Sequence, residues 1–377
     1  VMNAIHEPII DCGTLTAGVD ADADFIAAGV KPGDILVKRL DSTNYLITAC
    51  TATTLTLDGV PVSGDYVIIP RRFAAVYANG GNIYAKHYRM TDASLYNAAP
   101  YPVYNGPDTM LRPKTARGVN GNYYVAYYDS SNGNSYAKVI NGVGAIVTGG
   151  LSTNLGILMG AGEITKIESS PDGTIFYVMR KNAAGTIFYF AKYDSSLNLL
   201  APFIVNYTAS DASFSVDAAG NSYVAYCDYS VPAKTVTVVK YNNIGTVLFT
   251  QTFQLNNTTP QVFITKVMNI SIVHDGNGGA FVSWMDDRYF AIEGYHLVAV
   301  HIDSAGIPDV SSLSYSTGVS VGAYIGKIMG IPMTYSPSNL GSSLLYYDDG
   351  GAPYGALYLW YDYRNGAKEV FYKTLVH

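Results

Sequence analysis

The chain is poor in charge, in cysteine and in long apolar runs, and each shortage excludes a class of protein. Charged residues make up 14% of the 377 positions, where about 25% is usual. The net charge is −6 and the basic residues are scattered, so we do not expect nucleic acid as a partner. Three cysteines are too few for a disulfide scaffold, and no run reaches the roughly 18 apolar residues of a membrane span.

Sequence motifs for catalysis are equally scarce. The sequence has no Gly-x-Ser-x-Gly, no His-Glu-x-x-His and no phosphate-binding loop. The histidines fall at unrelated positions of the repeat described below, which does not favour metal ligation. We therefore predict neither a metal site nor a cofactor.

An enzyme of the sialidase type would need an arginine cluster, a Tyr/Glu pair and an acidic acid/base group around a central channel. Five arginines could supply the cluster: Arg112, Arg117, Arg180, Arg288 and Arg364. Glutamate is scarce beyond residue 70, which leaves few candidates for the pair. Ser170–Phe176 resembles an Asp-box turn but lacks one of its residues, so we interpret it as a hairpin turn. The sequence predicts a protein that is not an enzyme.

What the sequence does contain is a repeat. A block with a turn glycine, an alternating aromatic and aliphatic run and a closing aspartate occurs at Gly121–Asp129, Gly220–Asp228 and Gly278–Asp286. A second block, three residues followed by Lys or His, ends at Lys86, Lys138, Lys192, Lys240, His301 and Lys373. A two-residue alternation is typical of β-strands, and its repetition predicts an array of six similar units.

The length of one unit indicates the type of array. The intervals between successive Lys or His positions of the second block are 52, 54, 48, 61 and 72 residues. Units of roughly 40 to 50 residues with several short strands are typical of propeller blades, and no apolar stripe of helical period is present. In the third unit, turn residues separate four alternating runs: Glu163–Glu168, Ile175–Arg180, Thr186–Tyr193 and Leu199–Asn206. The sequence therefore predicts an all-β fold in which residues 71–377 form a six-bladed β-propeller.

Residues 1–70 lie outside this repeat. They form short runs rich in Thr, Val, Ile and Leu, which are typical of a small β-barrel or sandwich. The segment Phe25–Leu36 resembles one found in small β-barrel modules of bacterial surface proteins and phage tail proteins. Cys12 and Cys50 both fall in predicted strands of this module. They form either a disulfide that supports a small core or two buried thiols.

The last unit allows two interpretations. In the first, the Trp360-x-Asp362-x-Arg364 motif matches Trp284-x-Asp286-x-Arg288, residues 368–376 form the third strand, and the blade ends one strand short. In the second, residues 343–348, 355–361 and 367–375 are the second, third and fourth strands of a complete blade. We prefer the first, because the motif aligns three side chains in one register.

A third strand at the end of the sheet would expose unpaired backbone groups, which folded proteins normally cover. We expect the N-terminal segment Val1–Ile10, with Ile5 and Ile9 among its apolar side chains, to cover the edge that carries Val370, Tyr372 and Leu375. The donor belongs either to the same chain or to a neighbour. Addition from a neighbour, which we favour, would give a head-to-tail homopolymer.

One set of polar residues recurs where the second strand of a unit ends. It comprises Asp129, Asp228, Asp286, Arg288, Asp362 and Arg364. Such a ring on one face could bind a glycan or a protein. The alternative, which we prefer, is that each aspartate accepts hydrogen bonds from its own turn and each arginine pairs with an aspartate to join blades.

The Trp-x-Asp-x-Arg motif, followed by a tyrosine-bearing strand and Asp-x-x-Gly, resembles the blades of six-bladed propellers in secreted bacterial proteins. The match is full at Trp284 and Trp360, but Tyr127 and Tyr226 replace the tryptophan in two other units. The resemblance implies the fold and leaves the activity open, because propellers host enzymes, lectins and scaffolds alike.

Composition and fold together suggest a function. The 33 tyrosines provide apolar area with a polar tip, which suits surface contacts, and the chain starts with Val, which a removed leader would explain. We expect a non-enzymatic structural or adhesive protein, extracellular or on the cell surface, which forms a filament through its N-terminal segment. The alternatives are a carbohydrate-binding or sialidase-like propeller and a phage tail or receptor-binding protein.

Overall fold

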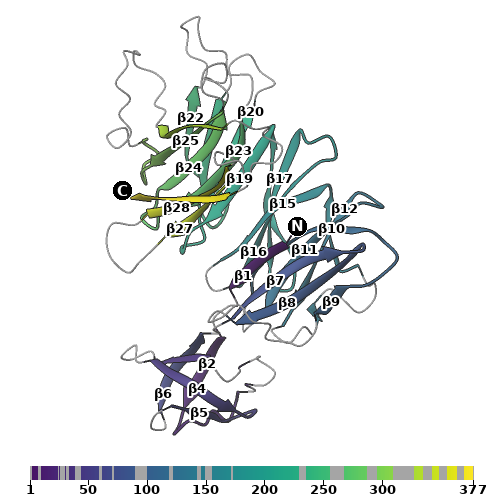
Figure 1. The fold of residues 1–377 in the computed structure, drawn as a ribbon, viewed down its shortest axis with the longest axis vertical. Helices are drawn as coiled ribbons and strands as arrows, with labels where there is room; N and C mark the ends of the chain where they lie inside the picture. The colour runs from purple at the N-terminus through teal and green to yellow at the C-terminus, as the bar shows by residue number, and fades with distance from the viewer. Residues whose placement is uncertain are drawn as a thin grey trace, which may run out of the picture. The chain divides into compact units, whose positions relative to one another are not determined.

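The computed structural model is all-β, and its described residues form strands and turns but no helix (Figure 1). It describes residues 2–6, 10–23, 25, 30, 34–38, 44–58, 62–69, 72–89, 100–118, 122–141, 146–148, 155–170, 173–228, 235–254, 267–286, 295–308, 327–333, 342–347, 355–362 and 369–376. Within these ranges no helix is long and apolar enough to cross a membrane.

A small antiparallel sheet near the N-terminus has the strand order β2-β6-β3-β4-β5. Its strands are β2 (Ile10–Leu15), β3 (Ile35–Lys38), β4 (Asn44–Cys50), β5 (Leu55–Leu57) and β6 (Gly64–Ile69). Phe25, Leu36 and Tyr66 are fully buried in its core, and the Tyr66 hydroxyl donates to Asp20 Oδ2 at 3.1 Å. These strands coincide with the Thr- and Val-rich runs of the sequence.

Within this single chain the N-terminal strand pairs with the first large sheet and not with the last one, and donation to a neighbouring chain stays a prediction. Strand β1 (Met2–His6) pairs antiparallel with β7 (Arg72–Asn79), and Ile5 lies opposite Ala74. Ile10 belongs to the small sheet and lies opposite Ile68, while Val1 and Ile9 lie outside the described residues. Because Ile10 pairs with Ile68, the two ends of the small sheet are adjacent. This adjacency brings β1 and β7 of the same chain together.

The larger antiparallel sheets follow one another along the chain. The first has the order β1-β7-β8-β9, with β8 (Asn82–Arg89) and β9 (Tyr101–Tyr104). The second contains β10 (Met110–Arg117), β11 (Tyr123–Asp129), β12 (Asn134–Ile140), β13 (Ile146–Thr148) and β14 (Ile157–Ala161), and both β13 and β14 pair with β12. The third contains β15 (Glu163–Ser169), β16 (Ile175–Lys181), β17 (Ile187–Asp194) and β18 (Leu199–Thr208).

The next two sheets repeat this four-strand order. One contains β19 (Asp211–Val216), β20 (Ser222–Asp228), β21 (Thr235–Tyr241) and β22 (Val247–Gln254). The other contains β23 (Val267–His274), β24 (Ala280–Asp286), β25 (Tyr295–Ile302) and β26 (Lys327–Met333). In both, each strand pairs with the next along the chain, as short hairpin connections require.

The last described sheet has three strands, β27 (Ser342–Tyr347), β28 (Gly355–Asp362) and β29 (Glu369–Val376). Trp360 lies on its second strand, as Trp284 does in the preceding sheet. This placement agrees with the first interpretation of the last unit, in which residues 368–376 form a third strand. Val370, Tyr372 and Leu375 pair with β28, and no strand of the described residues pairs with the other side of β29.

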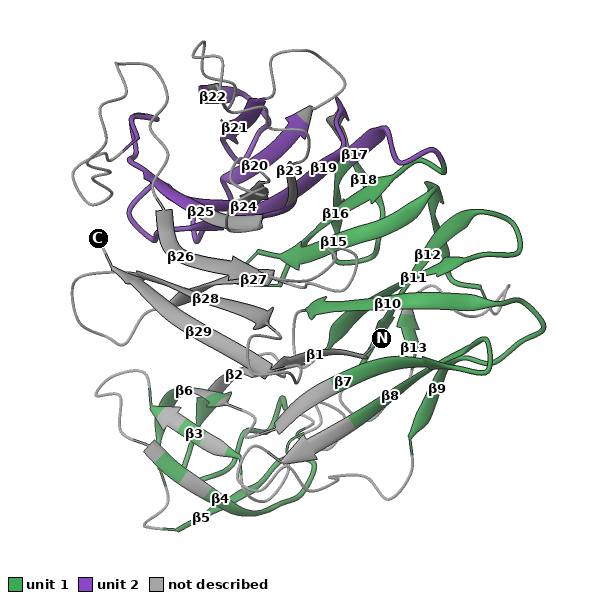
Figure 2. Ribbon diagram, turned by 45° about the horizontal axis from the view of Figure 1, so that its top comes forward, with its two compact units in different colours: residues 1–183, 190–204 green, residues 184–189, 205–377 purple. Residues whose placement is uncertain are grey.

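The chain divides into two compact units (Figure 2). Unit 1 comprises residues 1–183 and 190–204, and unit 2 comprises residues 184–189 and 205–377, so the boundary passes through β17 and β18. In unit 1, Tyr124 stacks on Phe176 with 4.4 Å between ring centroids. In unit 2, Trp284 is fully buried and packs against Phe253. Each unit therefore has its own aromatic core.

Candidate functional site

A capped turn recurs between neighbouring strands and uses the most regular polar side chains of the chain. In the turn between β19 and β20, Asp217 Oδ1 accepts the backbone N–H groups of Ala219 and Asn221, both at 2.9 Å. The same pair of bonds is made by Asp194, Asn242, Asp275 and Asp303. These side chains satisfy donors that a tight turn leaves without a partner.

The Asp-x-x-Gly spacing is the sequence signal for this turn, but these residues are not among the predicted site residues. Asp217 precedes Gly220 by three positions, and the glycine adopts a φ of 78° that suits its lack of a side chain. The predicted site aspartates close the second strand of a unit. The turn that recurs in the structure lies at other junctions, before the second strand and after the third.

Asp129 is the one predicted site aspartate whose side chain is described. It is fully buried, its Oδ1 accepts the Ser131 N–H at 2.8 Å, and its carbonyl accepts the Gly133 N–H at 2.9 Å. These bonds are the turn-capping role that we preferred. Its Oδ2 is buried with no hydrogen-bond partner among the described residues, so one acceptor stays open to a water molecule or a ligand.

The other members of the predicted ring cannot be placed with their side chains. Asp228, Asp286 and Asp362 end β20, β24 and β28, and their side chains lie outside the described residues. Arg288 and Arg364 lie outside them altogether. The ring as a binding face, and the pairing of its arginines with its aspartates, both stay predictions.

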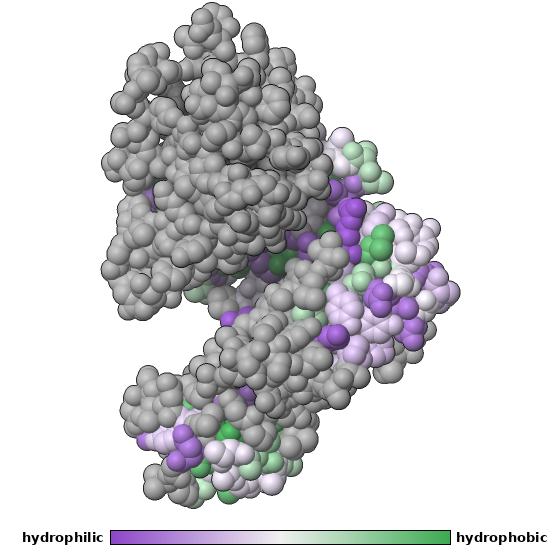
Figure 3. Space-filling model, in the orientation of Figure 1, coloured by the Kyte–Doolittle hydropathy of each residue, from purple (hydrophilic) through white to green (hydrophobic). Residues whose placement is uncertain are grey.

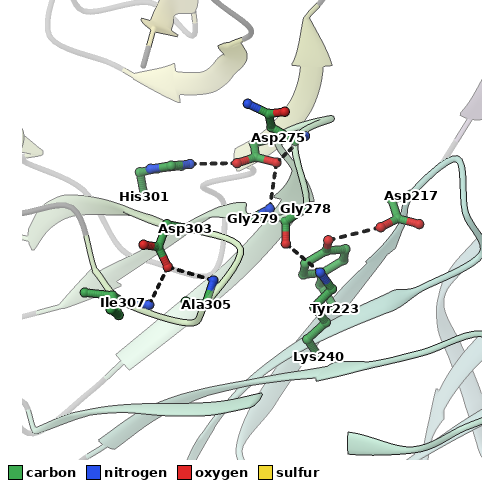
Figure 4. Close-up of polar contacts among 11 residues, drawn as sticks. Asp217, Tyr223, Lys240, Asp275, Gly278, Gly279, His301, Asp303, Ala305 and Ile307 are labelled. Carbon is green, nitrogen blue, oxygen red and sulfur yellow. Dashed lines mark hydrogen bonds and ion pairs between the residues drawn. The ribbon is translucent and has the colours of Figure 1, made fainter. Parts of the chain in front are cut away.

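A buried hydrogen-bonded pair lies in unit 2, where Asp275 meets His301 (Figure 4). His301 Nε2 is 2.8 Å from Asp275 Oδ2, and both residues are only 5% exposed. Asp275 Oδ1 accepts the N–H groups of Asn277 and Gly279. Burial raises the pKa of Asp275, but the bonds from His301 and the two N–H groups outweigh it and hold the pKa below its usual value. Both carboxylate oxygens are thus occupied by the protein itself.

Lys240 extends this arrangement toward a second turn (Figure 4). Its Nζ donates to the carbonyl of Gly278, in the Asp275 turn, at 2.6 Å, and lies 5.1 Å from the centre of the Tyr223 ring. The Tyr223 hydroxyl donates to Asp217 Oδ2 at 3.1 Å, and burial raises the pKa of this tyrosine. The chain of contacts therefore joins the turn before β20 to the turn before β24. Its geometry suits it to hold two sheets together.

The Lys and His positions of the second sequence block are not equivalent, although the sequence aligned them. Lys240 lies opposite Tyr223 in its ladder. Lys138 lies opposite Val125, whereas Tyr124 is the residue that matches Tyr223 in the repeat. Because side chains alternate between the two faces of a strand, this shift of one residue turns Lys138 to the face opposite that of Lys240.

On that face Lys138 is fully buried and contacts the preceding sheet. Its Nζ donates to the carbonyl of Val103 at 2.8 Å and lies 6.0 Å from the centre of the Tyr104 ring. Burial lowers the pKa of Lys138 to about 8. A backbone carbonyl and a ring face therefore stabilise this ammonium group only in part.

Two of the arginines proposed for a carboxylate-binding cluster, Arg112 and Arg180, have separate partners. Arg112 pairs with Glu163, whose carboxylate also lies 3.7 Å from Lys181 Nζ. Arg180 Nη1 donates to the carbonyl of Ala161. Burial lowers the pKa of Arg117. The described contacts do not bring these guanidinium groups onto one anion.

The remaining site predictions concern cysteine and metal. Cys50 is a partly exposed thiol whose Sγ donates to the carbonyl of Val30 at 3.3 Å, while the Cys12 side chain lies outside the described residues, so both alternatives stay predictions. A disulfide in the oxidised protein stays a prediction. Within the described ranges, no group of three or more His, Cys, Asp or Glu residues could hold a metal ion.

The visible surface gives no further candidate. On the described part of the face in Figure 3, hydrophilic and hydrophobic residues are interspersed. The exposed large apolar side chains of the described residues lie mainly in turns and at the ends of sheets, among them Ile244, Val247, Leu248 and Ile307.

Comparison with known proteins gives only distant likenesses. No family model matches the chain, and no curated protein matches it. Among solved structures, the Dos1 propeller is 10% identical with a TM-score of 0.44 and covers 84% of this chain and 72% of its own. The β-propeller domain of the trilobed protease from Pyrococcus furiosus is 10% identical with a TM-score of 0.40 and covers 81% and 94%. An endo-arabinase from Bacteroides thetaiotaomicron is 10% identical with a TM-score of 0.36 and covers 81% and 89%.

Proposed function

We propose that the protein is a non-enzymatic structural or adhesive protein, extracellular or on the cell surface. The observation that carries the proposal is the use of its buried ionisable side chains. Asp217, Asp275, Lys240 and Lys138 each donate to or accept from the backbone of a turn or of a neighbouring sheet. Groups whose hydrogen-bonding capacity holds turns and sheets together are poorly placed to act as acids, bases or nucleophiles.

The architecture we propose is a six-bladed propeller with a small barrel inserted into its first blade. The six larger sheets, from β1-β7-β8-β9 to β27-β28-β29, would be the blades. In the small sheet, a β-bridge between Val19 and Thr54 links the segment after β2 to the segment before β5, which supports closure into a barrel. The Trp-x-Asp-x-Arg motif would then mark the second strands of the last two blades.

The partner we propose is a glycan or protein at a surface. The supporting observations are compositional, with 33 tyrosines and only 14% charged residues. Tyrosine combines apolar area with a hydroxyl at low entropic cost, which suits recognition surfaces. Membranes and nucleic acids are not among the partners we propose.

The test is an activity panel combined with a glycan array on the purified chain. We expect no turnover of fluorogenic glycosides, esters and peptides above the buffer rate, with or without bound glycan. Asp275→Asn serves as a matched variant, since it should lower thermal stability and leave any binding intact. Turnover that disappears in Asp275→Asn at a temperature where the variant is folded would overturn the proposal in favour of an enzyme.

A further inference from the structure

Basic side chains of unit 1 gather around one carboxylate where the neighbouring strands β10 and β15 meet (Figure 2). The guanidinium group of Arg112, on β10, forms an ion pair with Glu163 Oε2 on β15. Lys181 Nζ lies 3.7 Å from the same oxygen, because Lys181 is directly opposite Glu163 in the ladder between β15 and β16. Glu163 therefore has two cationic partners from two different sheets.

Lys114 is a third cation at this place. It lies opposite Ala126 in the ladder between β10 and β11, so the two side chains share one face of the sheet. Ala126 packs in the same buried cluster as Ile164 of β15, which means that this face is turned toward β15. Burial lowers the pKa of Lys114, Glu163 raises it and Arg112 lowers it, so its ammonium group lies within the field of both charges. Lys114 is half-buried, and no described residue bonds to its ammonium group.

The backbone of β10 keeps Arg112 accessible. The strand has a bulge between Leu111 and Lys114, and Arg112 lies in this bulge with a φ of 52°. A bulge turns a side chain out of the regular alternation of its strand. The Arg112 side chain is 54% exposed while it bonds to Glu163, so a ligand in solvent can reach its guanidinium group.

The charges at this place do not balance. Three cations face one carboxylate, which leaves two positive charges without a counter-charge in a chain whose net charge is −6. The neighbouring basic groups are already engaged, since Arg180 donates to the carbonyl of Ala161 and Lys166 pairs with Glu168 at 2.8 Å. The positive excess is therefore confined to one point.

We propose that Arg112, Lys114 and Lys181 form a binding site for one acid group, a carboxylate or a sulfate, on an otherwise uncharged sugar. A guanidinium group binds such an anion through two parallel hydrogen bonds, and ammonium groups add point charges beside it. An acidic peptide carries charge along its length and would need a more extended basic surface than this one. The inference rests on the proposed function and names the class of glycan that the protein binds.

Glu163 has a defined part in this site. It holds Arg112 and Lys181 at one point when no ligand is bound, and it repels an arriving anion. The charge of Glu163 and the charge of the ligand therefore act in opposite directions on affinity. Removal of a cation should weaken binding, whereas removal of the Glu163 charge should strengthen it.

The test is a glycan array probed with the full chain, followed by calorimetric titration of the sugars that bind. The array carries uronic-acid and sulfated oligosaccharides, each beside its methyl-esterified or desulfated counterpart. We expect the charged member of a pair to bind about tenfold more tightly than the neutral one, and this preference to decline with added salt. The two kinds of charged sugar decide between a carboxylate and a sulfate.

Variants locate the binding on the chain. Arg112→Gln and Lys114→Gln should each raise the dissociation constant about tenfold for the charged sugar and leave that of the neutral sugar unchanged. Glu163→Gln should lower the dissociation constant for the charged sugar. Lys86→Gln is the matched control, with the same loss of charge at a partly exposed lysine of β8, and it should bind as the wild type does. Melting temperatures of the four variants show that each is folded at the temperature of the titration.

The outcomes separate this inference from the proposed function. Neutral sugars that bind as tightly as their acidic counterparts would overturn the inference and leave a glycan-binding protein. Unchanged affinity in Arg112→Gln and Lys114→Gln, or equal weakening in Lys86→Gln, would overturn it as well. So would an array on which no acidic sugar binds. Tighter binding of an oligoglutamate peptide than of any acidic sugar, lost in Arg112→Gln, would assign the site to an acidic protein instead.

Discussion

Lys138 in unit 1 and Lys240 in unit 2 hold the same place in a repeated block of sequence, yet they lie on opposite faces of their strands. Lys240 donates to Gly278 in the turn that Asp275 caps, within a network that contains carboxylates and a histidine. Lys138 donates to Val103 on an end strand, and no carboxylate among the described residues bonds to it. A shift of one residue in the register of the ladder therefore decides whether a buried lysine joins a network of charged and polar side chains or bonds to a backbone carbonyl outside such a network.

The largest effect is expected from removing the carboxylate of Asp275, which caps the turn that Lys240 contacts. Asp275→Ala should lower the free energy of unfolding by about 3–5 kcal/mol, because it leaves His301 and two backbone N–H groups buried without their acceptor. Urea denaturation of unit 2, followed by the fluorescence of buried Trp284, measures the change.

The matched control for this prediction is Asp303→Ala. Asp303 caps the same kind of turn but is not buried and has no histidine partner. Its removal should cost about 1 kcal/mol. Equal losses in the two variants would mean that the bond between Asp275 and His301 adds nothing to the turn, and the contrast between the two units would lose its energetic basis.

The lowered pKa of Lys138 predicts that the free energy of unfolding depends on pH in the alkaline range. Its pKa is about 8 in the folded chain, below the ordinary value of 10.5, so between these values the unfolded chain binds more protons than the folded chain. Stability should therefore rise as the pH increases from 8 toward 10.5, by about 3 kcal/mol at most. Unfolding of the wild type and of Lys138→Met across this range measures the effect. A slope that is unchanged in Lys138→Met would show that another group causes it.

The lowered pKa of Asp275 predicts that the free energy of unfolding also depends on pH in the acidic range. Because the pKa of Asp275 is held below its usual value, its charge stabilises the folded chain above the unfolded pKa of about 4. That stability is lost as the pH falls through the folded pKa. The difference in unfolding free energy between the wild type and Asp275→Asn should therefore shrink below pH 4. A difference that stays constant down to pH 2 would contradict the assignment.

The sequence predicted the positions of the strands well, but it predicted poorly on which face of a strand a given side chain lies. Alternating runs such as Glu163–Glu168 and Ile175–Arg180 became β15 and β16, because the two-residue period of an exposed or buried strand is a local property. The face on which Lys138 lies depends on the register between two paired strands. A match of four residues along one strand gives no information on that register. The same limit applies to β1, whose pairing with β7 depends on the small sheet between them.

The candidate site shows a similar division. The sequence identified Asp129 and its role in a turn, since aspartate before small polar residues favours such turns. It missed the pairing of Asp275 with His301, because one residue lies in the turn after β23 and the other on β25, and a contact between them depends on the order of the strands.

The smallest expected effect concerns Leu197, in a capped turn of unit 1 whose counterparts in unit 2 carry glycine. Leu197 has a φ of 66° and donates its N–H to the Asp194 carbonyl, in the position that Gly245 and Gly306 occupy in the turns of unit 2. A leucine in this conformation is strained by about 1 kcal/mol, but its side chain is 2% exposed in the core of unit 1, where burial contributes about 2 kcal/mol. Burial outweighs strain, so Leu197→Gly should destabilise unit 1 by about 1 kcal/mol, measured by urea denaturation. Leu197→Asn, which tolerates the conformation but loses the apolar contact, should be at least as destabilising as Leu197→Gly. A Leu197→Gly chain more stable than the wild type would show that backbone strain at Leu197 outweighs the burial of its side chain. The presence of leucine in unit 1 and glycine in unit 2 would then have no energetic basis.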